Sequence, residues 1–295
     1  METELVIRKG KFLQGALVLT LSLSILHPCS LAQQPASPTP DEQAWTLLRA
    51  GAKSSNADTR RVAIGALGII VKNRRAAVRA ENALSDDKVD VRIAAATALG
   101  QMESSASVPK LQAALEDKEP AVVLAAAQSL VRLRNARGYD VYYEVLTGQR
   151  AGGKGAVATE LDTLKNPKKL AELGFEEGVG FVPFGGMGLE TFRVLHGGSN
   201  SAVRAAAAKM LTRDPEPEAG TALTDAVSDK SWQVRVAAID AIAERGDPKL
   251  LAPIETAMQD DKDEVKYSAA AAVLRLLDVE RNQSRKSPKK KPLGN

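Results

Sequence analysis

Thiols and imidazoles are almost missing from this chain of 295 residues. It has one cysteine, Cys29, and two histidines. Cys29 lies in the N-terminal stretch that we interpret below as an export signal, so the mature chain is expected to have no thiol. Without a thiol, the mature chain could form no disulfide and no thiolate metal site, and it could have no cysteine nucleophile.

From residue 33 onward the only histidine is His196, which precedes two glycines. Histidine is the side chain used most often for general acid–base catalysis. Carboxylate pairs occur at Asp86-Asp87 and Asp260-Asp261, inside a repeated turn, and at Glu176-Glu177, where no repeat explains them. No Ser-His-Asp set can be nominated from these residues. The sequence predicts that the protein is not an enzyme and has no catalytic residue, metal site or cofactor.

Positive charge is concentrated at the C-terminus. The chain carries 40 basic and 36 acidic residues, a formal net charge of +4. Residues 280–295 hold six of the basic residues and one acidic residue, whereas residues 33–279 hold 31 and 33. A folded nucleic-acid-binding domain is expected to carry a basic stripe on its body. We therefore predict no nucleic-acid partner, and interpret 280–295 as a basic disordered tail or as a contact with an anionic membrane or polymer.

The sequence does contain a repeated block of about 31 residues. The valine before its basic residue recurs in steps of 31 within two series: Val91 and Val122, then Val203, Val234 and Val265. A fixed period in this range is the signature of a solenoid of helix pairs. One pair cannot bury its own apolar face, so neighbouring pairs must stack. We predict an all-α fold, an α-solenoid of about seven helix pairs.

Each block predicts a turn followed by an amphipathic helix. An aspartate begins the turn and a basic residue follows six positions later, as in Asp229 and Arg235. Alanine, leucine and valine then recur at helical spacing, which gives one buried face. Two blocks depart from the pattern, because Val123 and Lys266 stand where the other blocks have arginine.

These features resemble the HEAT repeat, and most closely the bacterial HEAT-like repeats named after phycobilisome lyases. The resemblance rests on the turn aspartate, the Val-Arg that follows, and a proline in the first helix, Pro109 or Pro253. It covers residues 41–147 and 199–279 and implies an armadillo-like superhelix.

The family also implies a ladder in which turn aspartates pair with helix arginines along the stack. The pairing joins residues of one repeat or of neighbouring repeats. The ladder residues are Asp86, Arg92, Asp117, Arg204, Asp229, Arg235, Asp260 and Lys266. HEAT-like enzymes include bilin lyases and a hydroxylase that binds iron through His-Glu dipeptides. This chain has no His-Glu dipeptide, which argues against the iron site.

Residues 1–32 predict an export signal. Three basic residues within positions 8–11 precede an apolar run from Phe12 to Leu26, and Ser30-Leu31-Ala32 offers small residues for cleavage. The run of 15 residues is shorter than the roughly 20 that a membrane-spanning helix needs. We predict cleavage after Ala32 and an exported, periplasmic or extracellular protein. An uncleaved membrane anchor is the alternative.

Residues 33–40 predict a Pro-rich linker, and Asp41 is expected to cap the first helix. Trp45 and Trp232 are expected to pack against neighbouring helices. The expected helices cover 41–51, 57–71, 74–84, 88–102, 106–115, 119–134, 139–146, 202–211, 216–227, 231–245, 248–258 and 263–279.

About fifty residues, 148–198, interrupt one repeat between its helices 139–146 and 202–211. This insertion holds 12 of the 22 glycines and every phenylalanine after the predicted signal: Phe175, Phe181, Phe184 and Phe192. A loop of this length is usually functional or disordered, and its apolar content argues against plain disorder. We consider three interpretations: a lid on the solenoid, a docking surface for a protein or apolar ligand, and a membrane-dipping hairpin.

The predicted function is a non-catalytic protein-binding scaffold of the bacterial cell envelope. Solenoids present extended surfaces, and their insertions lie on one face that often binds partners. The candidate partner-binding residues are the four phenylalanines of the insertion and Trp232. Two alternatives remain: a membrane-associated accessory protein that contacts lipid through the insertion and tail, and a lyase-type enzyme or enzyme accessory. The sequence names neither the protein partner nor the oligomeric state.

Overall fold

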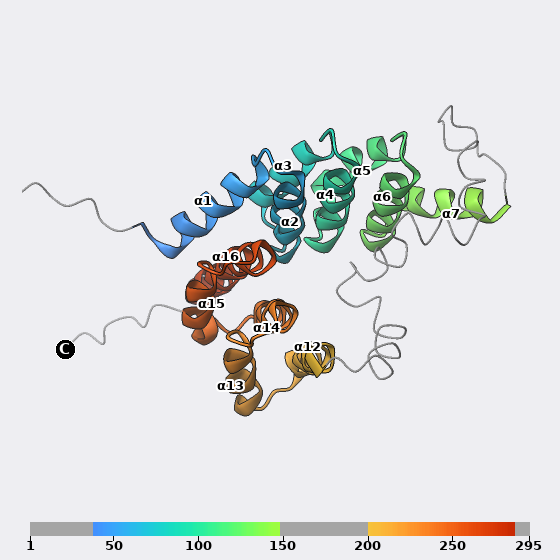
Figure 1. Ribbon diagram of the computed structural model, residues 1–295. Helices are drawn as coiled ribbons and strands as arrows, with labels where there is room; N and C mark the ends of the chain where they lie inside the picture. Colours follow the sequence, from blue (N-terminus) through green and yellow to red (C-terminus); the bar gives the residue numbers. More distant parts are fainter. Residues whose placement is uncertain (1–37, 148–199, 287–295) are drawn as a thin grey trace, which may run out of the picture. The chain divides into compact units, whose positions relative to one another are not determined.

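The computed structural model describes residues 38–147 and 200–286, and every regular element in these two ranges is a helix (Figure 1). The predicted all-α solenoid is confirmed. The predictions made for the export signal, the insertion with its four phenylalanines, and the last residues of the tail lie outside the described residues.

Helix pairs follow one another in both ranges. The first range holds α1 (Pro40–Ala52), α2 (Ala57–Ala66), α3 (Arg74–Ala83), α4 (Val89–Gln101), α5 (Val108–Ala114), α6 (Pro120–Arg132) and α7 (Arg137–Thr147). The second holds α12 (Asn200–Met210), α13 (Pro217–Ala226), α14 (Trp232–Arg245), α15 (Leu251–Ala257) and α16 (Asp263–Lys286). Single 3₁₀ turns are η1 (Leu67–Ile69), η2 (Ser105–Ser107), η3 (Leu211–Arg213) and η4 (Pro248–Leu250).

The start of α1 differs from the sequence prediction by two residues. Thr39 is the N-cap: its Oγ1 accepts a hydrogen bond from the Glu42 amide at 3.3 Å, and the Glu42 carboxylate accepts one from the Thr39 amide at 2.9 Å. This reciprocal capping box, with Pro40 at the first helical position, starts the helix there. Asp41 lies in the first turn, where the helix dipole favours a carboxylate.

Turn aspartates start the second helices α4, α6, α14 and α16. The Oδ1 atom of Asp86 accepts a hydrogen bond from the Lys88 amide at 3.0 Å. Asp229 accepts one in the same way from the Ser231 amide at 2.8 Å. This Asx turn holds amide groups that lie outside the helical hydrogen-bond pattern.

Three second helices end on a non-glycine residue with positive φ. Lys72, Glu103 and Arg134 have φ of 57°, 55° and 58° and recur every 31 residues. At the last of them, the Asn135 amide donates to the Leu130 carbonyl at 2.8 Å, as in a Schellman motif. In α14 the corresponding residue is Gly246, with φ of 66°.

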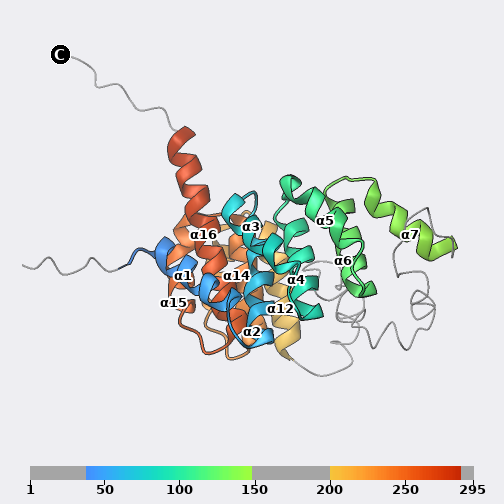
Figure 2. The ribbon, with the colours of Figure 1, turned by 90° about the horizontal axis from the view of Figure 1, so that it is seen from above.

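Second helices of neighbouring repeats lie side by side (Figure 2), and small residues allow them to pack closely. The Ser129 hydroxyl of α6 donates to the Ala96 carbonyl of α4 at 2.8 Å. A Cβ atom added to Gly100 of α4 would lie 2.5 Å from that hydroxyl oxygen. The alanine-rich blocks of the sequence therefore set the short distance between neighbouring repeats.

The spatial order of the repeats differs from their order in the chain. α16 packs against α1 and α2, so the second helices make contact in the order α12, α14, α16, α2, α4, α6. The last repeat of the chain thus lies beside the first.

The helices 139–146 and 202–211 do not pack as the expected repeat pair. α7 packs on α6 instead, where a Cβ atom added to Gly138 would lie 2.5 Å from the Ala127 carbonyl oxygen. On α4, the residues equivalent to Ala127 and Val131 are Ala96 and Gly100, which contact the next second helix. α7 therefore occupies the place of a following second helix, while α12 packs on α14.

The predicted boundary of the tail at residue 280 was wrong, because α16 continues to Lys286. Arg281 stabilises this extension through hydrogen bonds to Asp41 of α1 at 2.8 Å and to Asp278 at 3.1 Å. The sequence offers no helix breaker before Pro288.

Replacing Arg134 with glycine tests the strain at the repeated helix end. The left-handed conformation costs a non-glycine residue about 1–2 kcal/mol, and part of the gain is offset by the greater freedom of glycine in the unfolded chain. We expect Arg134→Gly to raise the free energy of unfolding in urea by about 0.5–1 kcal/mol. Gln128→Gly, in the interior of the same helix, should lower it by about 1 kcal/mol. A loss of stability in Arg134→Gly would contradict this account.

Candidate interaction surface

A ladder of arginines and aspartates joins neighbouring repeats. Arg92 of α4 donates to both carboxylate oxygens of Asp117, at 2.8 and 3.0 Å. Its third nitrogen donates to the Asp86 carbonyl of its own turn at 2.9 Å. Arg92 is buried, so this bidentate pair lies largely out of water.

An arginine pairs with an aspartate of the next repeat at three other places among the described residues. The rungs are Arg60 with Asp86, Arg204 with Asp229, and Arg235 with Asp260. Each carboxylate belongs to the repeat that follows, and the contact within one repeat is to the turn carbonyl alone. The ladder residues inferred from the family resemblance therefore join adjacent repeats rather than one turn to its own helix.

Two of the rungs lower the pKa of their aspartates. The hydrogen bonds from Arg204 hold the pKa of Asp229 below its usual value. The hydrogen bonds from Arg60 do the same for the pKa of Asp86. Charged hydrogen bonds stabilise the ionised carboxylate, so Asp86 and Asp229 stay negative near neutral pH.

The ladder is interrupted at both residues that depart from the sequence pattern. Val123 is buried and packs with Val141 of α7, a helix that offers no turn aspartate. Lys266 of α16 pairs with Asp263 of its own helix at 2.7 Å. The repeat beside α16 begins its turn with Ser54, so a basic residue there has no carboxylate to reach.

Polar side chains replace the missing rung at the contact between α16 and the first repeat. Thr59 donates to Asp263 at 2.8 Å, and Asn73 donates to Asp278 at 3.1 Å. Arg275 donates to the Ala243 carbonyl of α14 and to the Ile69 carbonyl of η1, which lies at 3.1 Å. Burial lowers the pKa of Arg275 from its usual value. This guanidinium therefore connects helices on both sides of α16.

On four of the second helices, α4, α6, α12 and α14, a stripe of residues stays at least partly exposed. It consists of the positions one, five and nine residues after the ladder position, and we call it the second-helix stripe. On four helices it comprises Ile93, Thr97 and Gln101; Leu124, Gln128 and Arg132; Ala205, Lys209 and Arg213; and Val236, Asp240 and Glu244. Because these helices pack side by side, their stripes form a continuous surface along α4 and α6, and another along α12 and α14.

Asp240 is the most perturbed carboxyl group of the second-helix stripe. Its Oδ1 atom is buried and has no hydrogen-bond partner among the described residues. Burial raises the pKa of Asp240 to about 7; the nearby Lys209 acts in the opposite direction, and Glu244 adds to the rise. Desolvation disfavours the ionised form, so this group titrates near neutral pH.

The two tryptophans lie in different environments. Trp232 begins α14 and is partly buried against the core. Trp45 is buried, with the guanidinium groups of Arg75 and Arg79 lying 4.1 and 5.0 Å from its ring centroid. Arg275 and Asp240 were not predicted from the sequence as residues of interest. A lone charge within an alanine-rich helix was the available signal for both.

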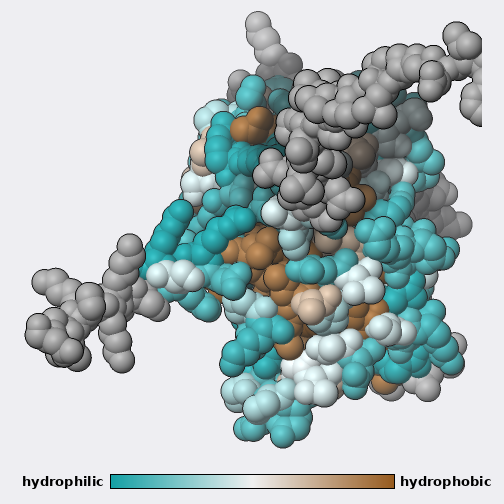
Figure 3. Space-filling model, turned by 90° about the vertical axis from the view of Figure 1, so that its left-hand side faces the viewer, coloured by the Kyte–Doolittle hydropathy of each residue, from teal (hydrophilic) through white to brown (hydrophobic). Residues whose placement is uncertain are grey.

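Large exposed apolar side chains mark three helices of the described chain. They are Val78 on α3; Tyr139, Tyr142 and Tyr143 on α7; and Val203 and Met210 on α12. Hydrophilic side chains dominate the face shown in Figure 3, and apolar residues gather in its centre. The exposed tyrosines and the α12 residues lie at the two helices that flank residues 148–199.

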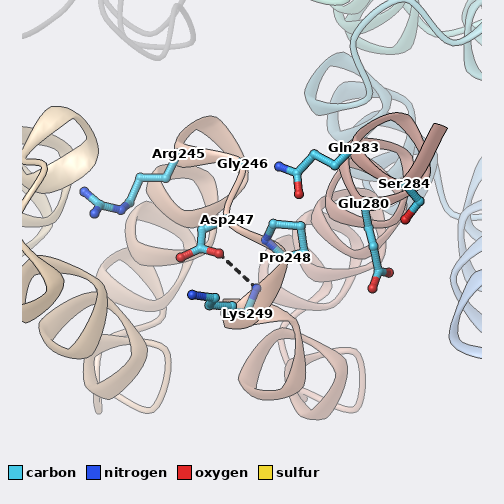
Figure 4. A pocket seen from close by; sticks show the side chains of 8 residues that line it. All are labelled: Arg245, Gly246, Asp247, Pro248, Lys249, Glu280, Gln283 and Ser284. Carbon is cyan, nitrogen blue, oxygen red and sulfur yellow. Dashed lines mark hydrogen bonds between the residues drawn. The ribbon is translucent and has the colours of Figure 1, made fainter. Parts of the chain in front are cut away.

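A shallow pocket of about 530 Å³ lies between the end of α14 and the extension of α16 (Figure 4). Arg245 extends away from the α16 residues and donates to carbonyls of Leu211, Thr212 and Asp214. Asp247 accepts from the Lys249 amide at 3.0 Å. Two of the lining charges thus hold the backbone in place, so their role here is structural.

Within residues 38–147 and 200–286, no three histidine, cysteine, aspartate or glutamate side chains are placed to hold a metal ion. None of the helices there combines the length and apolar character needed to cross a bilayer.

Comparisons with known proteins add a family match. A model for HEAT repeats matches residues 78–160 and 191–275, more than half of the chain. No curated protein sequence matches. Among solved structures, the CpcE–CpcF complex of phycocyanin lyase from Nostoc sp. PCC7120 is similar at 22% identity, with a TM-score of 0.32, over 86% of this chain and 99% of that chain. Human deoxyhypusine hydroxylase is similar at 16% identity, with a TM-score of 0.32, over 82% and 97% of the two chains.

Replacing Arg92 with methionine tests the contribution of a buried rung. The change keeps apolar volume but leaves Asp117 without its cation, and breaking a buried pair typically costs about 3–5 kcal/mol. We expect the free energy of unfolding in urea to fall by about 3 kcal/mol. Arg204→Met should lose less, because the Arg204 side chain is 31% exposed against 7% for Arg92. Equal losses in both variants would contradict the ladder account.

Replacing Asp240 with asparagine tests the raised pKa. At pH values between about 4 and 7, the unfolded chain ionises this group while the folded chain keeps it protonated, so its contribution to stability falls as pH rises. Asparagine cannot ionise. Asp240→Asn should therefore differ little from the natural chain at pH 4 and be more stable at pH 8, on the order of 2 kcal/mol in urea unfolding. A difference that is independent of pH would contradict the assignment.

Proposed function

Because the chain belongs to the HEAT-repeat family, we propose that it is a non-catalytic scaffold that binds a protein partner at the bacterial cell envelope. The observation that carries this proposal is the continuous surface formed by the second-helix stripes. Stacked repeats of this kind present extended surfaces suited to binding other proteins.

The stripe surface along α4 and α6 is the best candidate for the contact. Its central residues combine apolar and neutral polar side chains, Ile93, Thr97, Leu124 and Gln128, while Arg132 lies at one end. Protein interfaces commonly have an apolar core with few charges and a polar rim. The composition of this surface supports a protein partner rather than a charged small ligand.

Rigidity of the second helices supports the same role. The bidentate rung between Arg92 and Asp117 and the hydrogen bond from Ser129 to Ala96 fix α4 against the following repeat. A surface held in this way loses little conformational freedom when a partner binds, which favours affinity. Trp232 and the phenylalanines of residues 148–198 are proposed as additional contacts.

The envelope location rests on the N-terminal sequence. A basic stretch, an apolar run and small residues at 30–32 have the order of an export signal. We propose that the chain is cleaved after Ala32 and acts outside the cytoplasm. That it has no catalytic activity is part of the same proposal.

Partner capture from an envelope extract tests the stripe surface. We expect the double change Thr97→Arg and Gln128→Arg to reduce capture of chemically cross-linked partners severalfold, because two charges then lie in the proposed interface. The matched control, Asn82→Arg with Ala113→Arg, adds the same charge on α3 and α5 and should capture as the natural chain does. Circular dichroism checks that both variants stay folded.

Equal capture by the two double variants would refute binding through this surface. Capture from the cytosolic fraction alone would refute the envelope location while leaving the surface in place.

A further inference from the structure

The exposed apolar face of α12 corresponds to an interface that is covered in the other repeats. Val203, Ala207 and Met210 lie on this face, and Val203 and Met210 are 47% and 67% exposed. The equivalent residues of α14 are Val234, Ala238 and Ala241, which are at most 1% exposed. Among the described residues, α14 has a second helix on this side, namely α12, and α12 has none.

The other repeats show what kind of element covers such a face. On α6 the residue equivalent to Met210 is Ser129, which lies against Ala96 and Gly100 of α4. The covering element is therefore an alanine-rich second helix that approaches closely. Any occupant of the α12 face needs a helical surface with the same small and apolar side chains.

The other end of the repeat order is closed by α7. This helix already occupies the face of α6 that receives the next second helix elsewhere, with Gly138 against Ala127 and Val131. A second copy cannot continue the array head to tail on α6, because that position is filled. Since every other second helix also has a neighbour on each side among the described residues, the free face of the required kind in a second copy is its own α12.

We propose that two copies of this chain associate through their α12 faces, related by a two-fold axis near Ala207. In an antiparallel pairing, Val203 of each chain meets Met210 of the other, and the small Ala207 allows the helices to approach. Arg204 lies next to this face, but its charge is already paired with Asp229, so it does not disfavour the contact. Two-fold pairing is also the commonest form of self-association.

The dimer is expected to be weak. Stable interfaces bury about 800 Å² on each partner, and one helix of 11 residues offers less than that. Association should therefore depend on protein concentration in the micromolar range or above, and a single charge on the face should abolish it.

Sedimentation equilibrium of the full chain tests the proposal. The average mass should rise from that of one chain toward that of two as concentration increases, and Met210→Glu should remove the rise. Tyr143→Glu changes an equally exposed apolar side chain, on α7, and should leave the rise unchanged. Loss of association in Tyr143→Glu would indicate a head-to-tail contact through α7 and overturn the two-fold arrangement.

A cysteine at position 207 tests whether the α12 face is covered by a second copy or by residues of the same chain. In a Cys29→Ser background, Ala207→Cys is the sole thiol, and a two-fold axis near it brings the two Cα atoms within the roughly 4.4–6.8 Å that a disulfide requires. Mild oxidation should give covalent dimers much faster than with Val78→Cys, an exposed control on α3.

Three results would contradict the proposed dimer. A thiol at 207 that resists alkylation even in dilute, monomeric protein would show that the chain covers α12 with its own residues. A monomer at every concentration, or oxidation no faster than in the control, would also overturn the proposal.

Discussion

The structure depends on a guanidinium group that is satisfied only when the next repeat lies beside it. Arg92 uses one nitrogen on its own turn and the other two on the Asp117 carboxylate of the following repeat. A buried cation without its partner is costly, so a repeat with an arginine at this position requires a neighbour with an aspartate. The pair thus fixes both the register and the direction of stacking, which apolar packing between alanines alone specifies weakly.

The interruptions of the ladder follow the same rule. Val123 occurs where α7, which has no turn aspartate, follows α6. Lys266 occurs where the next repeat in space begins with Ser54. In both places the arginine and the turn aspartate are missing together, so neither is left without the other. Arg275 and the polar pairs of α16 with Thr59 and Asn73 join the repeats where a rung is absent.

The repeat unit could be predicted from the sequence because its determinants are local. The Asx turn at Asp229, the helical spacing after it and the period of 31 all lie within one block. The order of the repeats could not be predicted in this way. The contact of α16 with α1 and α2 joins residues more than 200 positions apart, as in the bond from Thr59 to Asp263, and no periodicity encodes it. For the same reason, the burial of Arg275 and Asp240 emerged only from the packed structure.

The contact between the first and last repeats also affects how the chain folds during synthesis. The faces of α1 and α2 that pack on α16 are made well before it, because 204 positions separate Thr59 from its partner Asp263. Contacts between such distant parts of a chain form slowly, and apolar surface that waits for them is prone to aggregate. The apolar surface of α1 and α2 therefore stays uncovered until α16 has been made, and a chain that stops before that helix leaves this surface exposed.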